Sequence, residues 1–303
     1  MLFSFFAMCI FSGNIISYTF YLSSCAQQRI AMRSLKENIN LELSKQEGIF
    51  AVTFKDLSTG KELLINDTVT FHAASTMKTP VLVEVYKQAA EGKFSLSDSL
   101  ILKNEFKSIV DGSLFNLDPT DDSETELYKH IGEKRTISSL LYQMIIVSSN
   151  LATNLIIELV DAKNVSVTMQ QLGAKDIHVL RGVEDGKAFA MGLNNIITAN
   201  GLMILFEKIA KGETVNPAAS QAMIDILLDQ KFNEIIPAGL PANAKVAHKT
   251  GSINGVQHDS GIVLLADGKK YVLVLLSKKL ANEKAAITAM ANVSKLIYEY
   301  VSR

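Results

Sequence analysis

Residues 245–277, with the sequence KVAHKTGSINGVQHDSGIVLLADGKKYVLVLLS, decide the fold because they contain three segments typical of β-strands. Aliphatic and β-branched residues concentrate in Lys245–Lys249, Ser260–Ala266 and Tyr271–Ser277. Asp267-Gly268 stands between the last two segments, and this dipeptide favours the tight turn of a hairpin. The stretch therefore predicts three strands of a sheet near the C-terminus.

Two further strands are predicted near the other end of the chain. Gly48–Leu57 (GIFAVTFKDL) is β-branched and aromatic, Ser58-Thr59-Gly60 is a turn, and Lys61–Asn66 follows as the second strand of a hairpin. Apolar residues at helical spacing predict helices before, between and after the two groups of strands. The segments predicted as helices are Ser34–Gln46, Ser75–Ala90, Ile137–Ile146, Ala152–Val160, Val165–Leu172, Ala199–Ala210, Pro217–Leu228 and Glu283–Val301.

The order of these elements predicts the fold class. The most economical arrangement pairs all five strands in one antiparallel sheet, packs the terminal helices on it and sets the helical block beside it. We therefore predict an α/β (α+β) protein with one domain over residues 30–303. Its α/β part comprises residues 34–72 and 213–303, and its helical part residues 73–212, because no repeat or low-complexity linker divides the chain.

Composition and missing motifs exclude several classes of function. The chain has 303 residues and a net charge of −1, which argues against a nucleic-acid groove, since such a groove needs clustered positive charge. Hydrophobic residues make up 48% of the chain, enough for a substantial core. The sequence contains no nucleotide-binding glycine motif, no Gly-x-Ser-x-Gly elbow and no clustered zinc ligands. We therefore expect no metal and no cofactor.

The first 25 residues have the features of an export signal. No charged residue precedes Arg29, and Leu2–Leu22 is mostly apolar, as in a signal peptide or a short membrane anchor. Leu22-Ser23-Ser24-Cys25 resembles a bacterial lipobox, whose cysteine is lipidated after cleavage. Two interpretations stay open: a lipoprotein with its lipid on Cys25, and a simple signal peptide in which this cysteine has no role. Both place the body in the periplasm or on the bacterial membrane.

Ser75-Thr76-Met77-Lys78 is the sharpest local motif. A serine and a lysine three residues apart on a helix share one face, so the amine can activate the hydroxyl as a nucleophile. Taken alone, the motif is also satisfied by a helix cap followed by a surface lysine. A second match, Ser58 with Lys61, lies in the predicted hairpin turn, where no helix aligns the two side chains.

Two other polar motifs stand at the ends of predicted elements. Ser148-Ser149-Asn150 lies between two helices, where a hydroxyl and an amide can project into a cleft or simply cap a helix. Lys249-Thr250-Gly251-Ser252 is expected to end a short strand. Its lysine supplies charge, its threonine a hydroxyl and its glycine room for a ligand near the backbone.

Together and in this order, the three motifs resemble those of the penicillin-recognising serine enzymes. Ser-x-Asn in the middle motif, rather than Tyr-x-Asn, points to the class A β-lactamases. The similarity runs from about Ser34 to Arg303 and includes the stretches MIIVSSNLATNLI and HDSGIVLLA. The resemblance implies the β-lactamase/transpeptidase-like fold.

The resemblance also implies a role for each matching residue. Ser75 would be the nucleophile that the β-lactam acylates, and Lys78 would relay or accept its proton. Ser148 would pass a proton to the β-lactam nitrogen, and Asn150 would bind the side-chain amide of the substrate. Lys249 would hold the substrate carboxylate.

Two further contacts with the substrate follow from the strand motif. Thr250 would share the carboxylate with the neighbouring lysine, and Gly251 would let the substrate approach the strand. The backbone N–H groups of Ser75 and Ser252 would form the oxyanion hole.

Glu184 is the match for the glutamate that activates the deacylating water in class A enzymes. It follows Arg181 in the long segment 181–195, which we predict to be a loop. The asparagine that usually follows the glutamate after four residues is replaced by Ala188. Asn194 or Asn195 could take its place from further along the loop.

Three functions follow as hypotheses. The first is a monomeric β-lactamase that hydrolyses small β-lactams through an acyl-enzyme on Ser75. The second is a D-alanyl-D-alanine peptidase with the same motifs and slow deacylation. The third is a non-catalytic envelope lipoprotein, which the nucleophile and amine pair of Ser75 and Lys78 argues against. Asp185 is a weaker rival of Glu184 as the base.

Overall fold

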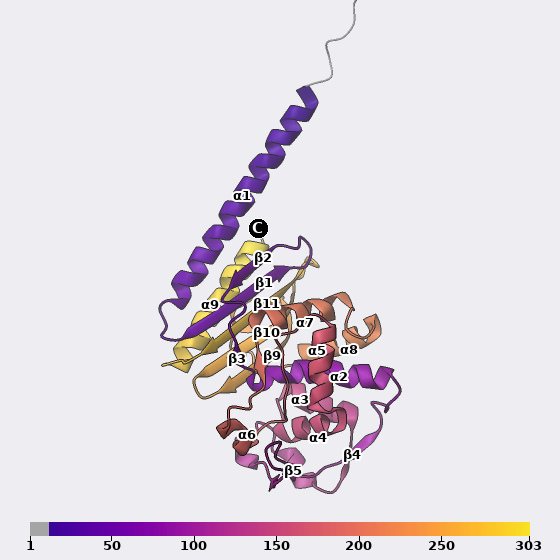
Figure 1. Ribbon diagram of the computed structural model, residues 1–303. Helices are drawn as coiled ribbons and strands as arrows, with labels where there is room; N and C mark the ends of the chain where they lie inside the picture. The colour runs from indigo at the N-terminus through magenta and orange to yellow at the C-terminus, as the bar shows by residue number, and fades with distance from the viewer. Residues whose placement is uncertain (1–11) are drawn as a thin grey trace, which may run out of the picture.

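The computed structural model describes the backbone of residues 12–303 and, Gln28 apart, the side chains from residue 27 onward (Figure 1). The first 11 residues of the expected export segment 1–25 lie outside the described residues. Helix α1 is Ser12–Leu43, so it begins well before the predicted start at Ser34. In the described part of the chain, no helix has the length and apolar character needed to cross a membrane.

Five antiparallel strands form the central sheet, which confirms the predicted arrangement. Their order across the sheet is β2-β1-β11-β10-β9, so the N-terminal hairpin pairs with the last strand of the chain. The strands are β1 Ile49–Asp56, β2 Glu62–Ile65, β9 Lys245–Ile253, β10 Val256–Leu264 and β11 Lys270–Lys278.

Strands β9 and β10 extend further toward the turn that joins them than the sequence predicts. They meet at Asn254-Gly255, where Gly255 has a φ of 71°, a left-handed conformation that favours glycine in a tight turn. The motif Lys249–Ser252 therefore lies within β9 instead of ending a strand. Pairing with β10 fixes the backbone of this motif along its whole length.

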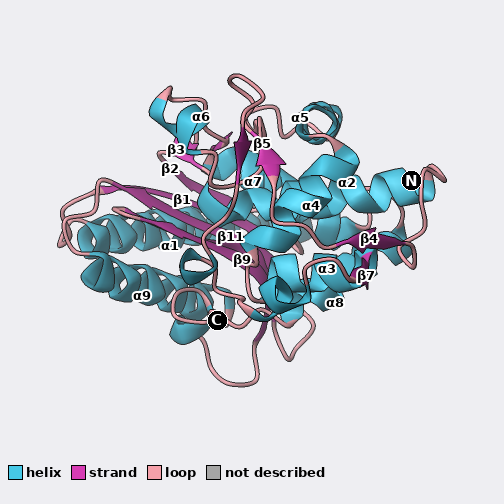
Figure 2. Ribbon diagram, turned by 90° about the horizontal axis from the view of Figure 1, so that it is seen from below, coloured by secondary structure: helices cyan, strands magenta, loops and turns pink. Residues whose placement is uncertain are grey.

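Helices cover both faces of the sheet. Helices α1 and α9 (Glu283–Val301) lie side by side on one face (Figures 1 and 2). Helix α7 (Ala199–Lys211), which we predicted in the helical part, packs against strands of the sheet. Strand β11 is buried on both faces: Leu273 and Leu275 belong to the α1–α9 core, and Val274 to the core shared with the helical part.

The helical part surrounds α2, whose Val81, Leu82 and Val85 are completely buried. The helices observed here and beside the sheet agree with the predicted segments within a few residues. They are α2 Lys78–Ala90, α3 Ile137–Ile146, α4 Asn150–Val160, α5 Ala162–Gln171 and α8 Pro217–Leu228.

Short elements that the sequence prediction lacks join these helices. Strands of two or three residues show no readable alternation, and single 3₁₀ turns show no helical period. The strands are β3 Phe71–His72, β4 Ser99–Ile101, β5 Phe106–Lys107, β6 Leu114–Phe115, β7 Lys134–Thr136 and β8 Ile196–Ile197. The 3₁₀ turns are η1 Ala74–Met77, η2 Pro119–Asp121, η3 Glu126–His130 and η4 Pro237–Gly239.

The segment 181–195, predicted as a loop, contains one short helix, α6 (Gly186–Ala190). The carboxylate of Asp185 accepts a hydrogen bond from the backbone N–H of Ala188 at 3.1 Å and so caps this helix. Five residues are too few to reveal a helical period, which explains the difference.

Candidate active site

A cleft of about 340 Å³ opens between strand β9 and the helical part. Figure 1 shows β9 next to α2, and the turn η1 before α2 contacts β9 directly. The cleft brings together residues from all three motifs. Those that line it include Ser75, Ser148, Asn150, Thr250, Gly251 and Ser252.

Ser75 lies in η1, immediately before α2, and its backbone is shaped by two neighbours. Ala74 has a φ of 45°, a left-handed conformation that costs energy for a residue with a Cβ atom. Strand β9 passes so close that a Cβ atom on Gly251 would lie 3.1 Å from the backbone nitrogens of Ser75 and Thr76. A side chain at this position would press on the segment of Ser75, so glycine suits the close approach of β9 to it.

Lys78 is completely buried at the start of α2, on the helical face that it shares with Ser75. Its Nζ donates hydrogen bonds to the carbonyl oxygen of Ser148 at 2.7 Å, to the Oγ of Ser148 at 3.0 Å and to the Oδ1 of Asn150 at 3.0 Å. Burial lowers the pKa of Lys78 to about 7, and the charges of Asp122 and Glu184 oppose this shift. Near neutral pH the amine is therefore available to accept a proton.

Lys249 reaches the same hydroxyl from β9. It is also completely buried, and its Nζ donates to Ser148 Oγ at 3.1 Å and to the carbonyl of Thr250 at 3.1 Å. Burial, followed by the positive charge of Lys78, holds the pKa of Lys249 well below its usual range, while Asp259 acts in the opposite direction. One hydroxyl oxygen thus links the two buried amines.

Ser148 occupies a strained turn between α3 and α4. Its φ is 60°, and the next residue, Ser149, caps α4 through a hydrogen bond from the N–H of Ala152 to its Oγ at 3.2 Å. Of the two serines in the motif, Ser149 is therefore the capping residue. Ser148 is left free to face the amines of the cleft.

Asn150 connects the amine of Lys78 with the carboxylate of Glu184. Its Oδ1 accepts from Lys78, and its Nδ2 donates to the Oε1 of Glu184. Partial burial of Glu184 raises its pKa, the hydrogen bond from Asn150 lowers it, and the negative charges of Asp122 and Asp121 raise it. The net shift is upward, which makes the carboxylate a stronger base.

The loop that carries Glu184 is held against α4 by an amide that sequence analysis missed. Asn154 donates from Nδ2 to the carbonyl of Val183 at 3.0 Å and accepts on Oδ1 from the N–H of Val183 at 2.7 Å. A Cβ atom on Gly182 would lie 2.2 Å from that Oδ1, so this position has no room for a side chain. The spacing of four residues from Asn150, on the same helix face, is the signal that could have revealed this contact.

Arg181 and the two asparagines close the loop on itself. Arg181 donates from Nη2 to Asn194 Oδ1 at 3.2 Å and from Nε to the carbonyl of Leu193 at 2.9 Å. Asn195 Oδ1 accepts from the backbone N–H of Arg181 at 3.2 Å, and its Nδ2 donates to the carbonyl of Arg181 at 3.0 Å. The side-chain amides of Asn194 and Asn195 thus bond to Arg181 of the same loop, and these hydrogen bonds do not involve Glu184.

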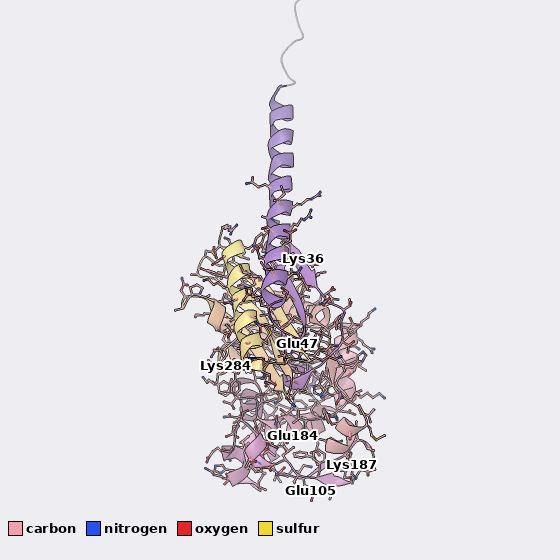
Figure 3. The ribbon with its side chains drawn as sticks, turned by 90° about the vertical axis from the view of Figure 1, so that its left-hand side faces the viewer. Lys36, Glu47, Glu105, Glu184, Lys187 and Lys284 are labelled. Atoms are coloured by element: carbon pink, nitrogen blue, oxygen red, sulfur yellow. The ribbon has the colours of Figure 1, made fainter. Side chains whose placement is uncertain are left out.

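Asp185 has a structural environment. Its carboxylate accepts hydrogen bonds from Ser108 Oγ at 2.9 Å, from the N–H of Ile109 at 2.9 Å and from that of Ala188. Burial would raise the pKa of Asp185, but these hydrogen bonds lower it below its usual value. Glu184 is therefore the acid of this loop that is bonded to a residue of the cleft, Asn150. Glu184 lies in the lower half of Figure 3, below Lys36 of α1.

The far end of β9 and the segment before Ser75 are held by two side chains outside the motifs. Gln257 Nε2 donates to Ser252 Oγ and to Glu283 Oε2, both at 2.8 Å. His258, completely buried, binds the carbonyl of His72 through Nε2 at 2.9 Å. These residues lie on β10, adjacent to the motif strand, and only the sheet register brings them to the cleft.

We expect Lys249→Ala to lower kcat/KM for a carboxylate-bearing penicillin by roughly ten- to a thousandfold. In the role that the resemblance implies for Lys249, the substitution removes one or two charge-assisted contacts of about 1.5–3 kcal/mol each. Steady-state kinetics checks this, with the exposed Lys245→Ala of the same strand as the control. Unchanged kinetics in Lys249→Ala would place the cation that binds the carboxylate elsewhere.

Ser75 near the buried Lys78, Ser148 bonded to Lys78 and Lys249, and the carboxylate of Glu184 bonded to Asn150 are the kinds of group that serine hydrolases contain. The chain belongs to the Beta-lactamase enzyme family, whose model matches residues 34–301. This match confirms the resemblance seen in the three motifs. No match is found among curated proteins.

Several solved structures are similar over nearly their whole length. PBP-A shares 26% identity at a TM-score of 0.77, with 89% of this chain and 96% of that chain covered. A mutant of PBP-A, described as an acyl-enzyme complex with penicillin G, shares 27% identity at a TM-score of 0.77 and covers 89% and 97%. The β-lactamase from Sphaerobacter thermophilus has the same fold, with 23% identity, a TM-score of 0.76 and coverage of 89% and 97%.

Proposed function

We propose that this protein hydrolyses β-lactam antibiotics through an acyl-enzyme on Ser75 and thereby confers resistance to them. The observation that carries the proposal is the amide of Asn150, which binds both Lys78 and Glu184. One hydrogen-bonded network beside Ser75 thus contains a group suited to forming the acyl-enzyme and a group suited to its hydrolysis.

Acylation would use the two amines. With a pKa of about 7, Lys78 accepts the proton of Ser75 as the hydroxyl attacks the β-lactam carbonyl. The proton then passes through Ser148, which both amines contact, to the nitrogen of the opened ring. The backbone N–H groups of Ser75 and Ser252 stabilise the oxyanion, and Lys249 binds the substrate carboxylate.

Deacylation would use Glu184. Its carboxylate removes a proton from a water molecule as this water attacks the ester carbonyl carbon on Ser75. The bond between that carbon and Ser75 Oγ breaks, the Oγ takes up the proton from Glu184, and the opened product leaves. The raised pKa of Glu184 suits a general base that works near neutral pH. Asn154 supports this role because it fixes the backbone directly before Glu184.

A time course of nitrocefin hydrolysis, followed by mass spectrometry of the intact protein, tests the proposal. Repeated turnover with little accumulated adduct supports a β-lactamase. Stoichiometric, long-lived adduct contradicts it and supports the second candidate, a penicillin-binding D-alanyl-D-alanine peptidase. That candidate is favoured by the two amides of the loop, Asn194 and Asn195, which are engaged with Arg181.

We propose further that residues 1–25 direct export and that Cys25 carries a lipid. The uncharged apolar stretch and the Leu22–Cys25 sequence support this location in the periplasm or on the membrane. In cells that make the lipoprotein, Cys25→Ala should move the protein from the membrane fraction to the soluble one, while Cys9→Ala should leave it on the membrane. Membrane association that survives Cys25→Ala contradicts the lipid anchor.

A further inference from the structure

Asp122 is a buried carboxylate outside the three motifs, placed directly after η2. Asp122 is only 6% exposed. Its Oδ2 accepts hydrogen bonds from the backbone N–H of Asn150 at 2.8 Å, from that of Leu151 at 3.0 Å and from the hydroxyl of Tyr128 at 2.9 Å. Its Oδ1 accepts from the N–H of Glu124 at 3.1 Å.

These contacts hold the first turn of α4. The first N–H groups of a helix have no partner within the helix, and a carboxylate is favoured there by the helix dipole. Ser149 satisfies the N–H of Ala152, and Asp122 satisfies those of Asn150 and Leu151. Asp122 thus holds the backbone of Asn150, whose side-chain amide lies between Lys78 and Glu184.

The charge of Asp122 is not neutralised by an ion pair within the described part of the chain. Its field acts on the groups behind Asn150: it raises the pKa of Lys78 and also that of Glu184. The other charged groups that face this pair are Lys249, which faces Lys78, and Asp121, which faces Glu184. Asp122 therefore shares the environment of the proton-transfer groups without facing the substrate side of the cleft.

We propose that Asp122 is a positioning residue for this chemistry: it fixes Asn150 between Lys78 and Glu184. From the same position its negative charge favours the protonated forms of these two groups. The proposal rests on the proposed function, because it assigns Lys78 and Glu184 the proton transfers described above. A buried acid contributed by a separate loop, 28 residues before Asn150, thus controls the geometry and the pH range of the site.

Asp122→Asn tests both parts of the proposal in the full-length protein. Acylation by a fluorescent penicillin should rise with pH as Lys78 loses its proton. Without the negative charge, Lys78 loses its proton at lower pH, so the rising limb of the pH profile of acylation should move to lower pH. The limb of the pH profile of hydrolysis that reports the titration of Glu184 should move in the same direction. The maximal acylation rate should fall by about ten- to a hundredfold, as expected when a hydrogen bond to a charged group is weakened.

Two matched variants separate charge from packing. Asp118→Asn removes one negative charge from the exposed part of the same loop, and we expect it to leave both limbs in place. Tyr128→Phe removes one hydrogen bond to Asp122 but keeps the charge of Asp122. It should lower the acylation rate less than Asp122→Asn does, and it should not move either limb of the pH profiles to lower pH. A rate loss in Asp122→Asn with both limbs in the wild-type position overturns the proposal, as does an equal shift in Asp118→Asn.

If Asp122→Asn does not fold, as judged by circular dichroism, Asp122→Glu replaces it. This variant keeps the charge but lengthens the side chain, so it should displace Asn150 and lower the acylation rate with the limb unmoved; a wild-type rate overturns the proposal. Failure of the proposed function is distinguishable, because the wild-type protein would then not be labelled by the penicillin at any pH.

Discussion

Ser75→Ala should abolish formation of the acyl-enzyme and lower the rate of β-lactam hydrolysis by about 10⁴-fold or more, the range seen when a serine nucleophile is removed. Ser75 lies in η1, directly before α2, with its backbone against β9 and one helical turn before the buried amine of Lys78. Neither Lys78 nor Ser148 can replace it, because both are bonded to one another on the inner side of the cleft. Mass spectrometry of the protein after incubation with penicillin measures the adduct directly.

Ser58→Ala is the matched control for this substitution. Ser58 also precedes a lysine by three residues, but it lies in the turn between β1 and β2, where its N–H donates to Asp56 Oδ1 at 2.8 Å. We expect acylation at the wild-type rate in Ser58→Ala. Adduct mass on the peptide that contains Ser58, or acylation that survives in Ser75→Ala, would contradict the assignment of the nucleophile.

Glu184→Gln should leave acyl-enzyme formation measurable and make its breakdown slow, by about 10²–10⁴-fold, the usual contribution of a general base. Glutamine keeps the size of the side chain and can still meet the amide of Asn150, but it cannot accept a proton from water. The adduct should therefore accumulate within one turnover of the wild-type enzyme, as measured by rapid quenching and intact mass.

Glu105→Gln provides the control because Glu105 is an exposed glutamate of the same lower half of the molecule (Figure 3). It should hydrolyse penicillin at the wild-type rate. Wild-type hydrolysis in Glu184→Gln, without adduct, would show that another residue is the base. Accumulation of adduct on the wild-type protein itself would favour the penicillin-binding peptidase.

Local sequence patterns were sufficient to predict the sheet and most helices. The strands of residues 245–277 and the hairpin near residue 50 carry strong β-branched or alternating patterns, and the helices α3, α8 and α9 begin and end at the predicted residues. The end of β9 was predicted too early, because the polar residues of Lys249–Ser252 resemble a turn when considered alone. Pairing with β10, which no local pattern contains, keeps them in the strand.

The candidate site was only partly predictable for the same reason. Ser75, Lys78 and Lys249 stand in short motifs that can be found by spacing along the chain. Asp122 and His258 reach the site from other elements, so their relation to it is created only when the chain folds. The proton affinities of the buried lysines likewise depend on tertiary burial, which the sequence does not specify residue by residue.

The pairing of β1 with β11 has a consequence for biosynthesis. Ile49 lies opposite Lys278, so the centre of the sheet joins two strands that lie far apart along the chain. A nascent chain that lacks β11 leaves β1 and β2 as an isolated hairpin, which is marginal in water. The domain therefore completes its core only after β11 has been made.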